Sequence, residues 1–440
     1  MDYSVFIVYF CKSLTNIVHK MILEIRLSNM FSIKNEIVLD MKSGGSKSKN
    51  ASSLSSNCFQ IKDYELLKSV AIYGANASGK TSIIKAISFC CMMVLNSHNH
   101  NEGAIFNYKP FKFEGFSKKP SSFFIRFIHE GVEYEYSFSF TQTEIVTESL
   151  YYYPNDRRAE VFVRDERKGK EKKDIYNFKS AIKRPMDVAI NTSKKTLFIS
   201  RASQMDRDVA KNVFNFFNTS LMFSPNLPAE AVETLFNTYK SVLLTALQIA
   251  DSDIVDIKLK KEKIHSKHVI LPTTPTDTIP VKDIEQTHLM FTTFHKSDPS
   301  VPFNLEQEES AGTQKLFFNM LLIIDIIKNN KTLLWDEIDL SLHSKIVEYI
   351  FTLFNSGNGA QLICTTHNTN LLNLHKMRKD QIFFVNKSID GASDLYSLFD
   401  YKDFRDTMDP EKAYLQGRFD AVPYIDDSEL TIKSLLGYEG

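Results

Sequence analysis

The sequence predicts an α/β fold, and three observations carry that prediction. Residues 66–73 form an apolar run that ends in a glycine-rich loop, and residues 80–96 follow with apolar side chains at helical spacing. Residues 111–163 alternate like the strands of a meander. From residue 286 onward strands and helices alternate, which is typical of a parallel α/β sheet. The chain of 440 residues is long enough for two or three lobes.

The remaining segments predict a mixture of strands, helices and loops. Residues 21–41 alternate apolar and polar side chains, which indicates a first pair of strands. Residues 203–250 have helical periodicity, and "DIVDIKLKKEK" (253–263) begins another strand. Polar or Pro-rich composition predicts three loops, at 42–56, 166–174 and 271–280.

The composition excludes several classes of protein. Apolar residues make up 43% and charged residues 24% of the chain, as in an ordinary globular protein. Lys plus Arg equals Asp plus Glu at 53 each, which argues against binding nucleic acid by bulk charge and leaves room for a local basic patch. The five cysteines have no CxxC spacing, so we expect reduced thiols in a cytoplasmic protein.

No membrane partner is expected, because no apolar run reaches the ~18 residues that a spanning helix needs. Residues 1–20 are predicted to be an N-terminal extension. A second methionine, Met21, precedes the first strand pair, so translation could start at Met1 or at Met21.

The stretch "VAIYGANASGKT" (70–81) matches the pattern GxxxxGK[ST] between a buried strand and a helix. Backbone N–H groups of such a loop, with the helix N-terminus, point at phosphate oxygens. Lys80 is predicted to reach the β- and γ-phosphates, and the Thr81 hydroxyl to ligate Mg²⁺. The nucleotide-binding residues predicted here are Gly74, Asn76, Ala77, Ser78, Gly79, Lys80, Thr81 and Ser82.

The stretch "KTLLWDEID" (331–339) places two carboxylates after a short apolar strand. Asp336 is predicted to hold the Mg²⁺ shell, through water. Glu337 is predicted to orient and polarise the attacking water. Taken alone, an apolar run followed by Asp-Glu is common, and its distance after the glycine loop is what favours the catalytic interpretation.

The stretch "EESAGTQKLFF" (308–318) predicts a helix that begins with a small, polar turn. Ser310 stands at the N-cap position, Gly312 leaves the backbone bare, and Thr313 follows. An exposed helix N-terminus can bind an anion. A capped core helix without a ligand is the alternative interpretation of the isolated pattern.

The stretch "AQLICTTHNTNLL" (360–372) predicts another buried strand, with His367 just after its end. A lone histidine there is often only a polar residue near a loop. Together the four motifs resemble an ABC-type ATPase head of the RecF/SMC/OLD-like group. In that resemblance His367 is the switch histidine at the γ-phosphate, and residues 339–343 are the D-loop at a dimer interface.

This resemblance implies an ABC-ATPase head, with a mixed sheet lobe carrying the P-loop, a β-rich arm and an inserted helical lobe. It implies ATP and Mg²⁺ as ligands, catalysis by Lys80, Glu337 and His367, and a homodimer in which Ser310, Gly312 and Thr313 complete the partner's ATP site. ESAGT departs from the transporter signature LSGGQ, and the Gln that the family usually has after its first helix is not found in "NYKPFKFE" (107–114). The predicted domains are an extension (1–20), lobe I (21–200), a helical and arm insertion (201–285) and lobe II (286–440).

The stretches "YKPFKFE", "LYYYP", "DEIDLSLH" and "AYLQGRFDAVPYI" add a closer resemblance to stand-alone prokaryotic ATPases of abortive-infection phage defence. Those ATPases are often paired with a RloB-type nuclease. Only 73 residues follow His367, fewer than the ~100 of a nuclease domain, so we expect a separate effector, a nuclease or a toxin. Two alternatives stay open: a RecF-like repair ATPase that binds DNA directly, and a scaffold with an inactive ATP site.

Overall fold

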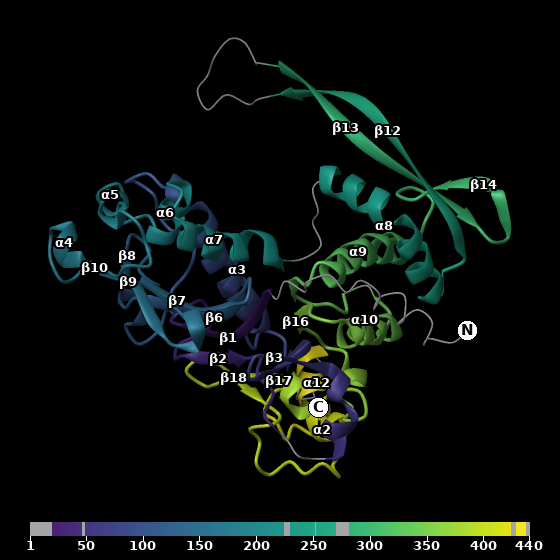
Figure 1. Cartoon of the computed structure of the whole chain (residues 1–440). Helices are drawn as coiled ribbons and strands as arrows, with labels where there is room; N and C mark the ends of the chain where they lie inside the picture. Colours follow the sequence, from purple (N-terminus) through teal and green to yellow (C-terminus); the bar gives the residue numbers. More distant parts are fainter. Residues whose placement is uncertain are drawn as a thin grey trace. The chain divides into compact units, whose positions relative to one another are not determined.

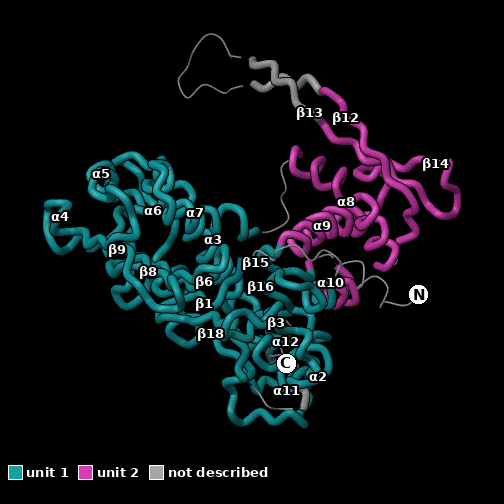
Figure 2. Tube along the Cα trace, viewed as in Figure 1, with its two compact units in different colours: residues 1–224, 330–339, 351–440 teal, residues 225–329, 340–350 magenta. Residues whose placement is uncertain are grey.

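The computed structural model describes residues 20–45, 49–223, 229–250, 252–269, 281–340, 342–423 and 428–436. The chain folds into two compact units (Figure 2). Unit 1 comprises residues 1–224, 330–339 and 351–440, and unit 2 comprises residues 225–329 and 340–350. Both combine helices with sheets, which confirms the predicted α/β fold class. The division into four domains made from the sequence stays a prediction.

Unit 1 contains a seven-stranded antiparallel sheet in the order β10-β9-β8-β7-β6-β1-β2. Along β6 buried and half-buried side chains alternate, because successive side chains of a strand point to opposite faces. The predicted strand pair at 21–41 and the predicted meander are confirmed as β1–β2 and β6–β9. The strands are β1 (Lys20–Ser28), β2 (Ile37–Asp40), β6 (Ser121–His129), β7 (Val132–Phe140), β8 (Ile145–Tyr152), β9 (Ala159–Asp165) and β10 (Tyr176–Phe178).

A six-stranded sheet in the order β11-β15-β16-β5-β17-β18 forms the second sheet of unit 1. All neighbouring pairs are parallel except β17 with β18. Every residue of β5, β15 and β16 is buried, which explains why these strands are continuous apolar runs. The strands are β5 (Ser69–Gly74), β11 (Leu221–Phe223), β15 (Thr332–Trp335), β16 (Gln361–Thr365), β17 (Ile382–Lys387) and β18 (Ser393–Ser397).

Helix α3 (Lys80–Asn96) follows β5 after the loop of residues 75–79 and packs with α6 (Phe198–Gln204) and α7 (Asp208–Ser220). Phe216 of α7 stacks on Phe127 of β6, with ring centroids 3.9 Å apart. Unit 1 also contains the small hairpin β3 (Cys58–Ile61) and β4 (Tyr64–Leu67). Its other helices are α2 (Lys49–Ser53), α4 (Lys172–Ile175), α5 (Pro185–Ile190), α11 (Pro410–Leu415) and α12 (Glu429–Leu436).

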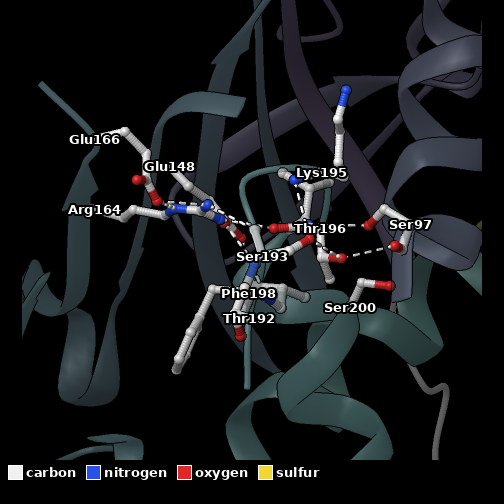
Figure 3. A network of polar contacts seen from close by, with 12 residues as sticks. Ser97, Glu148, Arg164, Glu166, Thr192, Ser193, Lys195, Thr196, Phe198 and Ser200 are labelled. Atoms are coloured by element: carbon white, nitrogen blue, oxygen red, sulfur yellow. Dashed lines mark hydrogen bonds and ion pairs between the residues drawn. The ribbon is translucent and has the colours of Figure 1, made fainter. Parts of the chain in front are cut away.

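A buried ionic network fixes the start of α6 (Figure 3). The carboxylate of Glu148 accepts hydrogen bonds from the N–H groups of Phe198 and Ile199, at 2.6 and 3.0 Å. Arg164, whose side chain is fully buried, reaches Glu148 and donates to the carbonyl of Thr196 at 2.7 Å. A carboxylate at a helix N-terminus satisfies free N–H groups. The network is therefore structural: it joins β8 and β9 to the helices that cover α3.

Unit 2 contains α8 (Ala229–Ile249) and α9 (Ala311–Lys328), which pack on each other, and the start of α10 (Ser344–Ser356). Beside them β12 (Ile254–Val269), β13 (Val281–His295) and β14 (Asp298–Asn304) form an antiparallel sheet. Strands β12 and β13 pair along their whole length as a long two-stranded ribbon (Figure 1). Three rings hold the unit together: Phe291 of β13 contacts Phe236 of α8 and Phe317 of α9.

Some sequence predictions were wrong or lie outside the described residues. The segment 42–56, predicted as a loop, contains α2 and ends in a 3₁₀ turn at Ser55–Asn57. Strand β11 interrupts the helical stretch 203–250, because three residues pair in parallel with β15, more than 100 residues away. The loop predicted at 271–280 and most of the extension at 1–20 lie outside the described residues.

Candidate functional site

Three adjacent parallel strands bring the predicted residues of unit 1 to one sheet edge. Strand β16 lies between β15 and β5, with Cys364 aligned to Trp335 on one side and to Ala71 on the other. The glycine loop follows β5, Asp336 follows β15, and His367 comes two residues after β16. Because parallel strands end on the same edge, segments far apart in the sequence meet there.

The glycine loop adopts a conformation that requires glycine at Gly79. Its φ of 116° is in the left-handed region, and a Cβ there would lie 2.1 Å from Oγ of Ser393 and 2.6 Å from Oγ of Ser32. The Ser393 hydroxyl donates a hydrogen bond to the carbonyl of Ser78 and bonds to the Ser32 hydroxyl at 2.8 Å. Two serines outside the motif therefore hold the loop against β18.

Lys80 is buried at the first turn of α3 and curls back over the loop. Its Nζ donates to the carbonyls of Gly74 and Ala75, at 2.7 and 3.0 Å. Burial lowers the pKa of Lys80, while the carboxylates of Glu337, Asp336 and Asp339 act in the opposite direction. The ammonium group is thus a partly desolvated cation among carboxylates.

Thr365, the last residue of β16, contacts both residues of the acidic pair, the carboxylate of Asp336 and the backbone of Glu337. Its fully buried hydroxyl donates to Oδ1 of Asp336 and accepts from the N–H of Glu337, both at 2.7 Å. Asp336 is half-buried, and Glu337 is exposed with a φ of 54°. A non-glycine residue rarely has positive φ unless its surroundings fix it. The hydrogen bond to the hydroxyl of Thr365 therefore helps to hold the backbone at Glu337.

His367 is exposed, and its N–H donates to the carboxylate of Asp339 at 3.1 and 3.2 Å. Partial desolvation by the atoms around the ring and the charge of Lys80 lower the pKa of His367, against the opposing effects of Asp339 and Glu337. A lowered pKa favours the neutral imidazole, which can donate one hydrogen bond and accept another.

The glycine loop combines one buried hydroxyl group with exposed residues. The Ser78 hydroxyl is buried and has no hydrogen-bond partner among the described residues, although it lies next to the backbone of the loop. Thr81 and Ser82 are half-buried on the first turn of α3, and Asn76 and Ala77 are exposed. No group of three His, Cys, Asp or Glu side chains able to hold a metal occurs in the described part of the chain. The hydroxyl of Thr81 and the carboxylate of Asp336 are oxygen donors of the kind that Mg²⁺ prefers.

The ESAGT turn, Glu309–Thr313, belongs to unit 2. Ser310 is the N-cap of α9, as predicted: its hydroxyl accepts from the N–H of Thr313 at 3.1 Å. Ser310 and Gly312 are exposed, and a Cβ on Gly312 would have only an ordinary contact at 3.7 Å. The turn thus presents bare backbone at the start of an 18-residue helix.

Sequence reasoning assigned no role to Thr365, Ser32 or Ser393. Thr365 lies in the strand end "CTTH", which the sequence shows. Its contacts with Asp336 and Glu337 depend on the fold and cannot be read from the sequence. Ser32 and Ser393 lie far from the loop in sequence and have no motif. Of the predicted D-loop, Ser341 lies outside the described residues, while Asp339 contacts His367.

The chain is similar to several solved structures. One is the SMC head domain from Thermotoga maritima, at 14% identity, with 86% of this chain and 98% of that chain covered and a TM-score of 0.37. Another is the Smc head domain with an extended coiled coil bound to the C-terminal domain of ScpA, derived from Pyrococcus furiosus, at 15% identity, with 90% and 98% covered and a TM-score of 0.38. An SmcHead bound to the C-winged helix domain of ScpA gives 17% identity, 86% and 97% coverage and a TM-score of 0.36.

No curated protein matches the chain. None of the helices in the described residues combines the length and apolar character that crossing a bilayer requires. A family match begins at the first residue of β5 and ends just beyond His367, so it contains the glycine loop, the ESAGT turn and the acidic strand. Over these residues, 69–373, the chain belongs to the family described as "AAA domain, putative AbiEii toxin, Type IV TA system".

Proposed function

We propose that the chain binds ATP and hydrolyses it in a Mg²⁺-dependent reaction at the carboxyl ends of β5, β16 and β15. The observation that carries this proposal is the meeting of Lys80, Asp336, Glu337 and His367 at these strand ends, from segments far apart in the sequence. Membership of the AAA-domain family supports it.

Each side chain has a role that its geometry suits. The loop N–H groups and the ammonium of Lys80 bind phosphate oxygens, exchanging the carbonyls of Gly74 and Ala75 for a stronger charge partner. Thr81 and Asp336 would hold Mg²⁺, which neutralises charge on the phosphates when bound. Glu337 accepts a proton from the attacking water, and neutral His367 hydrogen-bonds the γ-phosphate.

The proposed active form is a homodimer. In unit 2 the turn formed by Ser310, Gly312 and Thr313, with its exposed backbone at Gly312, suits the γ-phosphate held by a second copy. Closing and opening of the dimer would then control a separate effector, a nuclease or a toxin, in antiviral abortive infection. The family description and the resemblance in sequence motifs support this defence role.

The test is phosphate release by the purified full chain, with Glu337→Gln as the diagnostic variant. Removing the base is expected to lower turnover at least ~100-fold, while ATP still binds. This variant should also accumulate ATP-bound dimers, which can be measured by light scattering. Glu102→Gln, an exposed glutamate on a surface turn, is the matched control and should behave like the wild type. Unchanged turnover in Glu337→Gln would show that the base is assigned wrongly.

A RecF-like function on DNA is the second candidate, and one observation favours it. Strand β12 exposes Lys258, Lys260, Lys261 and Lys263 within six residues. Two of them pair with carboxylates, Lys260 with Glu262 at 2.8 Å and Lys261 with Glu233 at 2.6 Å, which reduces their free charge. ATP-dependent affinity for duplex DNA that falls steeply with salt would support this candidate, because the slope counts released counterions.

A further inference from the structure

One imidazole at the base of the ribbon contacts the segment that leads into the ESAGT turn. His295 is the last residue of β13, and its Nδ1 lies 2.8 Å from Oδ1 of Asp253. Its Nε2 lies 2.8 Å from Oε1 of Glu309, the residue directly before Ser310. Asp253 immediately precedes β12. A single ring therefore bridges the start of one ribbon strand, the end of the other and the turn.

The residues around this ring leave it little freedom. The side chain of His295 is 15% exposed, and its ring packs edge-on against Phe303 of β14 at 4.7 Å. The carboxylate that it contacts is itself fixed, because Glu309 also accepts a hydrogen bond from the buried hydroxyl of Thr293. On the other side of the turn, Nε2 of Gln314 donates to the carbonyl of Glu309 at 3.0 Å. Glu309 is thus held at both its side chain and its backbone.

Both ring nitrogens face a carboxylate, which only accepts hydrogen bonds. A neutral imidazole has one N–H, so only the imidazolium can donate to Asp253 and Glu309 together. Burial of the ring opposes the charged form, but the two carboxylates outweigh it and raise the pKa of His295. On the same strand end, Lys296 uses its backbone N–H to bond the carbonyl of Asp253 at 2.9 Å.

We propose that His295 is a positioning residue for the ESAGT turn. By joining both ribbon strands to Glu309, it holds Ser310, Gly312 and Thr313 in the orientation that binds the γ-phosphate of a second copy. This inference rests on the proposed ATPase function and adds a residue outside the motifs on which that function depends. The conformation of the turn then also depends on the contacts of Asp253 and His295, where β12 begins and β13 ends.

The sign of the pH dependence follows from the geometry. The charged bridge is fully formed below the ordinary histidine pKa of about 6.5 and is lost as the pH rises through the raised pKa of His295. ATP turnover that needs the dimer should therefore decline in that range. Binding of ATP to the glycine loop of one copy should not follow this decline, because Lys80 and Thr81 belong to unit 1.

The experiment compares full-length variants by phosphate release between about pH 6 and pH 9, with a fluorescent ATP analogue reporting nucleotide binding. His295→Phe keeps a ring but removes both donors, and should lower turnover about 10-fold with analogue binding unchanged. His295→Gln keeps N–H donors on one nitrogen without a titrating group, and should retain turnover between those of His295→Phe and the wild type and remove the decline at high pH. His288→Gln, on the same strand and 3.6 Å from Glu306, is the matched control.

A fourth variant keeps the test decisive if His295→Phe fails to fold. Asp253 is 62% exposed, so Asp253→Asn should fold, lose one carboxylate partner and shift the turnover profile to lower pH. Profiles identical to the wild type in Asp253→Asn and His295→Gln would overturn the role of His295. Failure of the proposed function has a different result: the wild type and His288→Gln would both release no phosphate.

Discussion

The glycine loop and the ESAGT turn both begin a helix with exposed backbone, yet they are built in opposite ways. The glycine loop is fixed by long-range structure: β5 lies between β16 and β17, and Ser32 and Ser393 press against Gly79. The ESAGT turn is held by local hydrogen bonds of Ser310 and Gln314 and by the carboxylate of Glu309. A substitution in the first should therefore change folding, and one in the second should change activity while leaving folding nearly intact.

Gly79→Ala is expected to have the largest effect on stability. The φ of 116° and the contact with Ser393 together should cost about 3 kcal/mol and abolish ATP binding. Urea denaturation and binding of a fluorescent ATP analogue measure the two effects. Gly115→Ala is the matched control, because Gly115 has a φ of 74° and no atom within 4 Å of the place where a Cβ would lie, and so isolates the conformational cost. Equal losses of stability in Gly79→Ala and Gly115→Ala would contradict the importance of the contact with Ser393.

Thr365→Val should have the next largest effect. It removes the buried hydroxyl between Asp336 and Glu337 and leaves their groups without that partner, at a cost of about 2 kcal/mol. Turnover should fall about 10-fold or more, because Glu337 loses the bond that fixes its backbone. Denaturation and phosphate release check the two effects. Thr365→Ser keeps the hydroxyl and should retain most of the turnover. If Thr365→Ser lost as much turnover as Thr365→Val, the methyl group and not the hydroxyl would be the important part of Thr365.

Ser310→Ala removes the N-cap of α9 and should cost about 1 kcal/mol. Hydrogen exchange of peptides from the start of α9 should rise, while peptides from β5 and α3 should stay protected, because the glycine loop belongs to the other unit. Turnover should fall more than the stability change alone explains. Ser310→Asp, which also caps helices, should restore protection while its charge repels the γ-phosphate.

Gly312→Ala should have the smallest effect on stability. The helix tolerates a Cβ there, with its nearest contact at 3.7 Å, so unfolding should change by less than about 1 kcal/mol, toward greater stability. Turnover and ATP-dependent dimerisation should nevertheless fall, because the methyl group keeps a second copy's phosphate from the backbone. A variant as active as the wild type would show that no phosphate approaches Gly312 closely.

The sequence predicted the parts of this molecule that have local signals. The alternation in β6, the glycine loop and the N-cap at Ser310 are encoded within a few residues, and the structure has them where they were expected. Strand β11 is three residues long and depends on β15, so nothing local distinguishes it from the helical stretch around it. The helix α2 lies in a Ser-rich segment whose composition is typical of loops.

The supporting contacts of the site were beyond prediction for a related reason. Thr365 contacts Glu337, 28 residues away in the sequence, and His295 contacts Asp253, 42 residues away. A threonine at a strand end and a histidine at the end of another strand are ordinary in sequence. The residues that they contact can be identified only when the register of β15 with β16 and of β12 with β13 is known.

The sheet order also has a consequence for synthesis on the ribosome. Strand β5 is completed at Gly74, but β16, its neighbour on one side, ends at Thr365. At ~5–20 residues per second, the strand that carries the glycine loop waits about 15–60 s for that partner to be made. Val70, Ala71 and Ile72 are fully buried in the finished sheet. The sheet around this apolar segment is complete only after β16 is made, so the proposed nucleotide site is among the last parts of the chain to form.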